Sequence, residues 1–277
     1  MTARPRLVLP ALALLVAVSV GCGPAPPPTG LLIAHALGGL DVPYSNSREA
    51  LERNYAAGRR WFEVDLALTA DGRLVCFHEG LEKVVDLQRP ITETPAAVML
   101  SHRFDGRYTL IDFAWLLARM ETLEDLVVVT DTKRWTAPVC AAFERDLAPV
   151  PRSVRRRVVP QIYRPEDLAP VREIEARLTR FRYVIFTLYF ISISDDDVVL
   201  FTARAHIPIV TMNTERFNAA VAARLHALGA RVYVHTLNDH AEIVRFAGAG
   251  ADGFYTDTYR PFSDYFPLGV QPKIGAR

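Results

Sequence analysis

The amino-acid sequence predicts a (β/α)8 barrel with a small β-hairpin extension after the second strand. Short apolar runs recur along the chain, and amphipathic helical segments separate them, which is typical of a parallel sheet buried on both faces. The expected strands are residues 31–35, 61–68, 126–131, 158–163, 183–188, 207–212, 231–237 and 252–257. Eight such strands within about 230 residues favour a closed barrel over an open doubly wound sheet. Pro160 counts against the fourth strand, because proline cannot donate a hydrogen bond to a neighbouring strand.

Helix ends are marked by short local signals. Asn46 or Ser47 is expected to cap the first helix, and Glu49 is expected to reach back and complete a capping box. Gly58 and Gly229 each stand just before an expected strand, where a left-handed residue commonly ends a helix. These signals support the alternation of helices and strands.

The hairpin extension is predicted from the Asp71-Gly72 pair, the strongest short-range signal for a hairpin turn. If these two residues form the turn, Asp65 lies opposite His78 on the returning strand, within reach of a cross-strand contact. A three-residue loop would shift this register by one residue. The hairpin is therefore expected to carry His78 back beside Asp65.

The segment that precedes the barrel has the pattern of a targeting sequence. Residues 1–21 combine a basic start, an apolar run and a small final residue, which predicts a signal peptide of the lipoprotein type. Acylation of Cys22 would then anchor the protein on the cell envelope after export across the inner membrane, on the periplasmic or cell-surface side. Plain secretion and an uncleaved anchor are the alternatives. Residues 22–30 are predicted to be a Pro-rich linker, and residues 31–277 the barrel domain.

The composition excludes several classes of protein. The chain has 32 basic and 31 acidic residues, whereas nucleic-acid-binding proteins usually show a strong basic excess, so no nucleic-acid partner is expected. Three cysteines exclude a disulfide-stapled small fold, and no spacing indicates a zinc cluster. The basic run at residues 152–157 is predicted to be solvated surface, and contact with anionic lipid headgroups is a minor alternative.

Three carboxylates are expected at the C-terminal ends of the strands, where barrel enzymes carry their active sites. Glu63 and Asp65 share one face of an apolar strand, and Asp131 ends the next strand, with Lys133 on the same face. A single divalent ion would satisfy carboxylates that otherwise repel one another and are costly to bury. Oxygen ligands without sulfur favour Mg²⁺ or Ca²⁺ over zinc. The alternative is a salt-bridged interior in which Lys133 is the counter-ion.

Two histidines are expected to join this acidic cluster. His35 ends the first strand, which neighbours the second strand in any such barrel, and the hairpin returns His78. A single histidine at a strand end is usually a satisfied polar residue. Two histidines that converge on a carboxylate cluster instead favour a functional site.

This set of residues resembles the glycerophosphodiester phosphodiesterase family. The similar positions are His35, Glu63-x-Asp65, Thr69-x-Asp71-Gly72, His78, Gly250-Ala251-Asp252-Gly253 and Thr256-Asp257. The resemblance implies a (β/α)8 fold, a divalent ion on Glu63, Asp65 and a third acid, and two catalytic histidines that act as acid and base. The third acid is usually Glu in the family, and Asp131 matches it by position with a shorter side chain.

The sequence departs from the family pattern around the expected substrate pocket. The family's first histidine is followed by Arg-Gly, but His35 is followed by Ala36-Leu37, so Lys133 becomes the main cationic candidate for substrate binding. His235 stands on the seventh strand where an aromatic residue is common, and it is a second candidate for substrate binding. These differences leave the expected metal and acid–base residues intact.

The resemblance implies a metal-dependent phosphoric diester hydrolase that acts on glycerophosphodiesters or related phospholipid headgroup esters, as small-molecule or lipid substrates. One alternative is an enzyme similar to phosphatidylinositol-specific phospholipase C, which also uses a barrel and two histidines, without metal in bacterial forms. A second alternative is a non-catalytic surface lipoprotein that binds headgroups. Loss of activity in a chelator would distinguish the metal-dependent hydrolase from the phospholipase C-like enzyme. Release of glycerol 3-phosphate would distinguish it from the non-catalytic lipoprotein.

Overall fold

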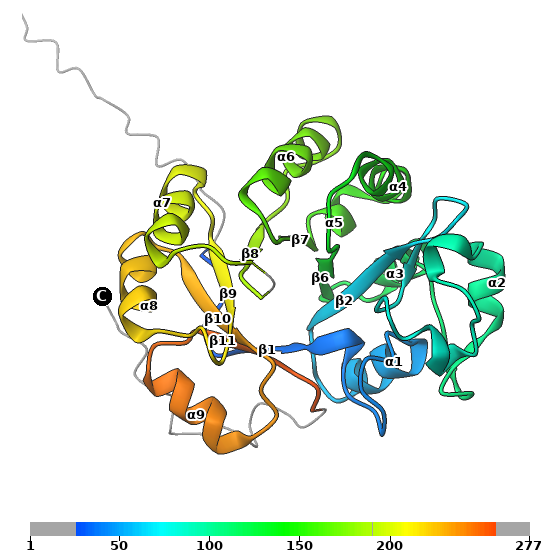
Figure 1. Ribbon diagram of the computed structural model, residues 1–277, viewed down its shortest axis with the longest axis horizontal. Coiled ribbons are helices and arrows are strands. Elements are labelled where there is room, and N and C mark those ends of the chain that lie inside the picture. Colours follow the sequence, from blue (N-terminus) through cyan, green and yellow to red (C-terminus); the bar gives the residue numbers. More distant parts are fainter. Residues whose placement is uncertain (1–25, 190, 259–277) are drawn as a thin grey trace, which may run out of the picture.

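The computed structural model describes residues 26–189 and 191–258, which form a closed barrel of eight parallel strands surrounded by helices (Figure 1). The ring closes because the first strand pairs with both the second and the last. The barrel strands are β1 (Leu31–Ala34), β2 (Trp61–Leu68), β6 (Val127–Asp131), β7 (Val158–Ile162), β8 (Ile185–Thr187), β9 (Ile209–Asn213), β10 (Arg231–His235) and β11 (Gly253–Thr256). The predicted fold is confirmed, and every expected strand region overlaps one of these strands.

Helices connect the strands and cover the outer face of the barrel. They are α1 (Arg48–Ala56), α3 (Phe113–Thr122), α4 (Ala137–Leu147), α5 (Arg152–Arg155), α6 (Leu168–Arg177), α7 (Asp195–Ala205), α8 (Ala219–Ala227) and α9 (His240–Gly248). The main core lies between this shell and the sheet, where Phe62, Phe143 and Val210 are fully buried. Gly58 and Gly229 have φ angles of +94° and +80°, as expected for residues that end helices.

The barrel interior changes from apolar to polar along its axis. Ile33, Val129, Ile185 and Tyr233 belong to one buried apolar cluster inside the ring. Side chains two residues further along a strand point to the same face. The residues that follow on β2, β6, β7 and β8 are Glu63 and Asp65, Asp131, Gln161 and Thr187, all of which are buried. The C-terminal end of the barrel is therefore lined by polar groups.

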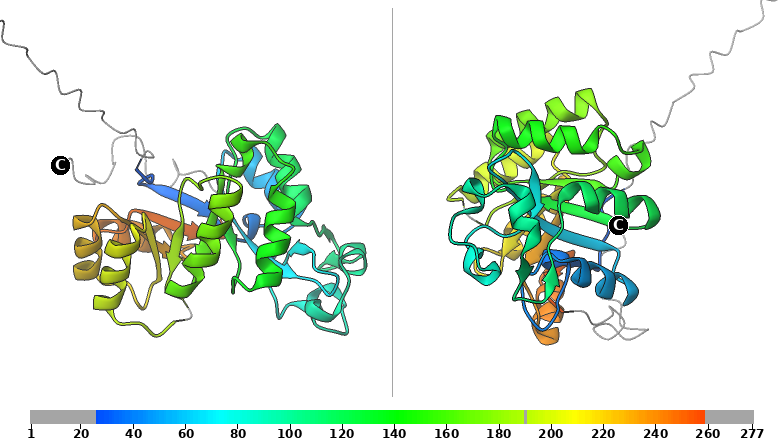
Figure 2. Two further views of the ribbon diagram at one scale, coloured as in Figure 1. Left: turned by 90° about the horizontal axis from the view of Figure 1, so that it is seen from above. Right: turned by 90° about the vertical axis from the view of Figure 1, so that its right-hand side faces the viewer.

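An extension of the chain follows β2 and projects from one side of the barrel (Figure 2). It contains β3 (Leu74–Cys76), the short helices η2 (Glu82–Val85), η3 (Ile91–Glu93) and α2 (Ala96–Ser101), and the strand pair β4 (Arg103–Phe104) and β5 (Tyr108–Thr109). A second small core holds it together, and Phe77, Ile91 and Met99 are among its buried members. The predicted hairpin is thus the start of a larger insertion.

The expected two-residue hairpin turn is wrong. β2 and β3 pair Leu66 with Cys76 and Leu68 with Leu74, so the register is shifted by one residue. The loop has three residues between Thr69 and Arg73, whose backbone amide and carbonyl are 2.9 Å apart. Gly72 takes the left-handed position of this loop. Phe77, not His78, therefore lies opposite Asp65, and its amide donates to the Asp65 carbonyl at 3.0 Å.

The capping box expected at α1 is only half formed. The Ser47 hydroxyl caps the helix by accepting from the Ala50 amide. Glu49 does not reach back, because its carboxylate accepts hydrogen bonds from the amide and the hydroxyl of Thr109 in the extension. Glu49 thus ties α1 to β5.

Proline does not prevent the fourth barrel strand from forming. Pro160 lies within β7 and is aligned with Thr130 of β6. The strand keeps its neighbours on both sides, because β7 pairs with β6 and with β8.

Several sequence predictions concern segments that the structure does not describe. The signal peptide at residues 1–21 and Cys22 lie outside the described residues, as do residues 259–277 of the expected barrel domain. Within residues 26–189 and 191–258, none of the helices has the length and apolar character needed to cross a membrane.

The hairpin geometry makes a testable prediction about backbone conformation. Gly72 has a φ angle of +71°, and no atom lies within 4 Å of the point that a Cβ would occupy, so a side chain there meets backbone strain alone. Gly72→Ala should therefore lower the free energy of unfolding by about 1 kcal/mol, measured by urea denaturation. Gly248→Ala is the matched control, because Gly248 ends α9 without a positive φ and is equally uncrowded. It should raise stability by about 0.5 kcal/mol, and equal effects of both changes would contradict the assignment.

Candidate active site

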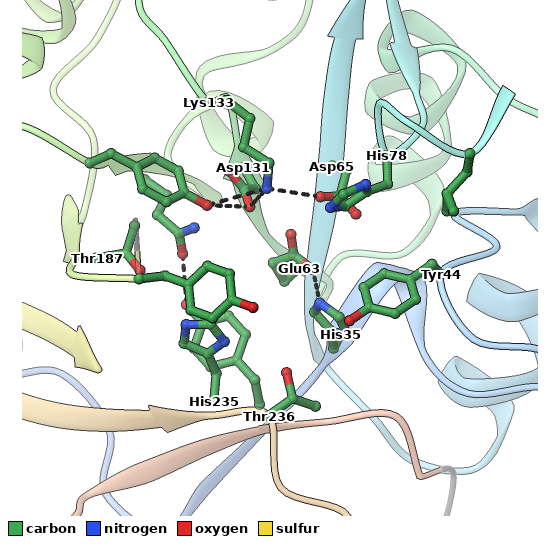
Figure 3. Close-up of a pocket in the computed structure, with 15 residues that line it drawn as sticks. His35, Tyr44, Glu63, Asp65, His78, Asp131, Lys133, Thr187, His235 and Thr236 are labelled. Atoms are coloured by element: carbon green, nitrogen blue, oxygen red, sulfur yellow. Dashed lines mark hydrogen bonds and ion pairs between the residues drawn. The ribbon is translucent and has the colours of Figure 1, made fainter. Parts of the chain in front are cut away.

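A cavity of about 360 Å³ opens at the C-terminal end of the barrel. Its lining includes all seven residues that the sequence predicted as site residues, which are His35, Glu63, Asp65, His78, Asp131, Lys133 and His235. They come from several different strands or the segments that follow them, and their side chains gather around one space (Figure 3). The barrel closure thus assembles one pocket from residues that are distant in the chain.

Three buried carboxylates form the centre of this pocket. Glu63, Asp65 and Asp131 each offer an oxygen within 4.8 Å of the others, which is the spacing of ligands around one ion. The strand register explains this proximity, because Asp65 and Asp131 are aligned partners on β2 and β6. Glu63 Oε1 and Asp131 Oδ1 are buried, and neither accepts a hydrogen bond from any described residue. Two unpartnered carboxylate oxygens at this distance fit a hard divalent cation.

The other carboxylate oxygens are held in place by the protein. Glu63 Oε2 accepts from the Ala36 amide at 2.8 Å, which is possible because Ala36 adopts a left-handed conformation with φ 50° after β1. Asp65 Oδ2 accepts from the side-chain amide of Asn46 at 3.0 Å. Asp131 Oδ2 accepts from the Tyr163 hydroxyl at 2.7 Å. Each acid is therefore oriented by one neutral donor on one of its oxygens.

Lys133 supplies positive charge to this acidic cluster. Its Nζ lies 2.5 Å from Asp131 Oδ2 and 3.3 Å from Asp65 Oδ1, and it donates to Tyr163 at 3.2 Å. Lys133 is thus both a lining residue of the cavity and a counter-ion. One lysine cannot balance three carboxylates, and Glu63 does not pair with it.

The incomplete neutralisation of the three carboxylates shifts their pKa values. Burial raises the pKa of Glu63 to about 8, and the negative charge of Asp65 adds to this rise. Burial also opposes ionisation of Asp65, but the attraction of Lys133 outweighs it and keeps the pKa of Asp65 below its usual value. At neutral pH, Glu63 therefore holds a proton unless another cation takes its place.

His35 is positioned by a carboxylate from the last strand region. Its Nδ1 lies 2.8 Å from Asp257 Oδ1, and its Nε2 lies 3.9 Å from Glu63 Oε2. Burial alone would lower the pKa of His35, but the hydrogen bond to Asp257 and the charges of Glu63 and Asp65 raise it to about 9. Gly39 permits this contact, since a Cβ at that position would lie 1.4 Å from the Asp257 carbonyl oxygen.

His78 reaches the pocket despite the shifted hairpin register. It follows β3 by two residues and lines the cavity with Asp65. Its Nδ1 lies 2.8 Å from the backbone carbonyl of Glu79, which only a protonated Nδ1 can satisfy. The Tyr44 ring stands between the two histidines, with its centroid 4.9 Å from His35 and 5.5 Å from His78.

His235 lines the opposite wall of the cavity. Its ring packs between Tyr189 and Tyr255, with centroid distances of 4.8 and 5.6 Å. Burial lowers its pKa to about 4, and the nearby His35 contributes to this decrease. His235 is therefore neutral at physiological pH, and its Nε2 is buried without a partner among the described residues. It can exchange a hydrogen bond with a ligand but cannot contribute a positive charge.

Sequence reasoning missed four residues that shape the pocket. They are Asp257, Asn46, Tyr163 and Tyr44. One of them had a signal in the sequence, because Asp257 ends the last segment that resembles the family. The sequence indicated Asn46 only as a possible helix cap. In the structure the Asn46 side chain forms two hydrogen bonds with Asp65. Its Nδ2 donates to the carboxylate, and its Oδ1 accepts from the Asp65 backbone amide at 3.1 Å.

Acidic and histidine side chains gathered at the C-terminal mouth of a barrel are typical of an active site. A family model described as the glycerophosphoryl diester phosphodiesterase family matches residues 38–260. The chain therefore belongs to this family, and it is a phosphoric diester hydrolase of the glycerophosphodiester phosphodiesterase type. Among curated proteins, no match was found.

Solved structures of similar fold agree with this assignment. A phosphodiesterase from Oleispira antarctica in complex with its product sn-glycerol-3-phosphate has a TM-score of 0.71 at 16% identity, covering 86% of this chain and 96% of its own. A glycerophosphodiester phosphodiesterase from Thermotoga maritima has a TM-score of 0.64 at 19% identity, with coverages of 84% and 97%. A glycerophosphoryl diester phosphodiesterase from Parabacteroides distasonis has a TM-score of 0.67 at 15% identity, with 90% of both chains covered. At these identities the likeness shows the fold.

The contact between His35 and Asp257 predicts a measurable change in ionisation. In protein freed of metal by a chelator, Asp257→Asn should lower the pKa of His35 from about 9 toward its ordinary value of 6.5, measured by NMR of the imidazole. Because the folded pKa is raised, the stabilisation from this pair is complete below pH 6.5 and is lost as the pH rises through 9. The stability deficit of Asp257→Asn should shrink over that interval. An unchanged His35 titration would contradict the contact.

Proposed function

We propose that this protein hydrolyses glycerophosphodiesters by metal-dependent acid–base catalysis with His35 and His78. The observation that carries the proposal is the meeting of three buried carboxylates, two of them with an unpartnered oxygen, and two imidazoles in one cavity. The cavity of about 360 Å³ is of a size that holds a small phosphodiester. Its volume favours glycerophosphodiesters, or the headgroup part of a phospholipid ester, as the substrate.

Glu63, Asp65 and Asp131 are the proposed ligands of a divalent ion. Their all-oxygen donor set favours Mg²⁺ or Ca²⁺. Such an ion, when bound, supplies a Lewis acid that neutralises charge on the phosphoryl oxygens. The Ala36 amide, Asn46 and Tyr163 hold the three carboxylates apart from one another in fixed orientations, so the site does not have to be assembled on binding.

The two histidines are the proposed proton-transfer groups. Asp257 holds the Nδ1 proton of His35, and the Glu79 carbonyl holds the Nδ1 proton of His78. In both rings Nε2 is therefore the nitrogen available to take up or release a proton. One ring would deprotonate the attacking oxygen, and the other would protonate the leaving alcohol.

Lys133 and His235 are the proposed substrate-binding residues. The Lys133 ammonium group lies beside the carboxylates and provides positive charge where a phosphate would bind. The neutral His235 ring offers its unpartnered Nε2 as a hydrogen-bond partner for a hydroxyl or phosphate oxygen. Together they take the place of the arginine that the family carries after its first histidine.

The proposed location follows from the sequence alone. We infer that residues 1–21 are removed on export and that Cys22 carries a lipid that anchors the enzyme on the envelope side of a membrane. Within the Pro-rich segment at residues 22–30, only the part before Pro26 would then separate the lipid from the barrel, because Pro26 and Pro28 accept hydrogen bonds from barrel tyrosines.

Substitution of either histidine tests the catalytic proposal. His35→Ala and His78→Ala should each lower kcat for glycerophosphocholine by about 10²–10⁴-fold while the circular dichroism spectrum is unchanged. His102→Ala is the control, because His102 lies at the end of α2 and does not line the cavity. Full activity of either site variant would refute the assigned role of that histidine.

Metal binding can be measured without any assay of activity. Saturating Mg²⁺ or Ca²⁺ should stabilise the chelator-treated protein, by about 2.7 kcal/mol when the ion exceeds its Kd by about 100-fold. Glu63→Gln should lose most of this response, yet it should be about as stable as the wild type without metal, because burial raises the pKa of Glu63 to about 8 and Gln resembles the neutral carboxylic acid. Glu144→Gln, whose carboxylate pairs with Arg177 outside the cavity, should respond like the wild type.

The response of activity to metal ions distinguishes this proposal from a metal-free phospholipase C mechanism. Activity should disappear with a chelator and return with Mg²⁺ or Ca²⁺. Activity that persists in the chelator, with phosphatidylinositol as the preferred substrate, would instead support the metal-free phospholipase C mechanism, in which Lys133 serves as the counter-ion of the carboxylates.

A further inference from the structure

The segment before β1 is docked onto the end of the barrel opposite the active site. The Tyr183 hydroxyl donates to the carbonyl of Pro26 at 3.1 Å, and the Tyr233 hydroxyl donates to the carbonyl of Pro28 at 2.7 Å. Both tyrosines are buried, with exposures of 3% and 0%. Gly30 then joins the barrel by donating to the Asp252 carbonyl at 2.7 Å. Any residue before Pro26 therefore starts from this N-terminal end of the barrel.

This same end carries a group of exposed arginines. We call it the basic face and define it by Arg152, Arg156, Arg180 and Arg182, which precede β7 and β8. These two strands are neighbours and parallel, so the segments that lead into them lie at the same end of the barrel. None of the four arginines forms an ion pair with a residue in the described part of the chain. Arg180 and Arg182 line a surface pocket together with Pro26.

Two acidic groups at this end are already neutralised. Asp125 is paired with Arg60 at 2.5 Å, and the buried Asp252 is paired with His226 and Arg231. Glu121 and Glu124 are exposed nearby without such pairs among the described residues. The basic face therefore keeps a net positive charge in a chain whose overall formal charge is only +1.

We propose that the basic face docks on an anionic lipid surface, so that the active-site mouth points away from the membrane toward water. Positive side chains close to an anionic bilayer are attracted within about one Debye length of it. Leu228 adds an exposed apolar side chain at the same end, directly before Gly229 of the surface pocket. The enzyme would then take phosphodiesters that are dissolved in water, not lipids embedded in the membrane that holds it.

Chain length supports this orientation, in a step that rests on the proposed lipid at Cys22. Only three residues lie between Cys22 and Pro26, so the two Cα atoms are at most about 14 Å apart. The barrel strands of four to five residues are about 13–17 Å long, and the mouth lies at the end of these strands opposite the docked segment. A lipid at Cys22 would therefore bring the basic face to the bilayer and keep the mouth off it.

Vesicle binding tests the charge of the docking surface. The protein from residue 22 onward, with Cys22→Ser to prevent acylation, should sediment with vesicles of about one third phosphatidylglycerol in phosphatidylcholine at low salt. It should not sediment with pure phosphatidylcholine, and about 0.5 M NaCl should release it. The variant with Arg152, Arg156, Arg180 and Arg182 all changed to Gln should bind about tenfold more weakly or worse. The control changes four exposed basic residues elsewhere to Gln, namely Arg48, Lys83, Arg89 and Arg103.

The two sets of substitutions carry equal charge, so nonspecific attraction would affect both alike. Equal losses in the two variants, or no binding of the starting protein to anionic vesicles at low salt, would overturn the proposal. None of these measurements depends on catalysis, so they remain informative whatever substrate the enzyme has.

Orientation is tested by a matched pair of labelled sites. In a Cys140→Ser background, Ser153→Cys places a label on α5 within the basic face, and Ser101→Cys places one at the end of α2 in the extension. Both serines are exposed, and the remaining Cys76 is fully buried. An environment-sensitive fluorophore at position 153 should shift to shorter wavelength on anionic vesicles, and the same fluorophore at position 101 should not. The reverse pattern would show that the mouth faces the bilayer.

Discussion

Mutual repulsion among three buried carboxylates is the constraint on which the active site depends. Glu63, Asp65 and Asp131 meet within 4.8 Å, and Lys133 balances only part of their charge. Burial makes this imbalance costly, which is why the pKa of Glu63 is raised to about 8. The protein supports the arrangement with neutral donors and leaves two oxygens unpartnered among the described residues. Such a site fits a hard divalent cation.

Closure of the barrel supplies the second part of the site. His35 follows the first strand and Asp257 the last, and these strands are neighbours only because the ring closes. The close approach of Gly39 to the Asp257 backbone shows how tightly the two chain regions fit. The contact between His35 and Asp257 therefore depends on complete folding, because a barrel that lacked its last strand would leave His35 without its carboxylate partner.

The two ends of the barrel have different chemistry. Polar and titratable groups line the C-terminal mouth, an apolar layer fills the middle, and the N-terminal end combines a docked proline segment with exposed arginines. The apolar layer separates the acids of the mouth from the bases of the opposite face. The same scaffold can therefore hold a hydrolytic site at one end and a surface for anionic lipid at the other.

The sequence by itself determined the strands and the shared face of Glu63 and Asp65, because periodicity and alternation are local properties of the chain. It also placed both histidines at strand ends, where the family resemblance implied catalysis. Only the structure decided the hairpin register, because the Asp71-Gly72 pair is compatible with both a two-residue and a three-residue loop. The partnership of His35 with Asp257 spans 222 residues and follows from barrel closure, which no local pattern encodes. Likewise, Asn46 could cap a helix or hold Asp65, and packing against β2 selected the second role.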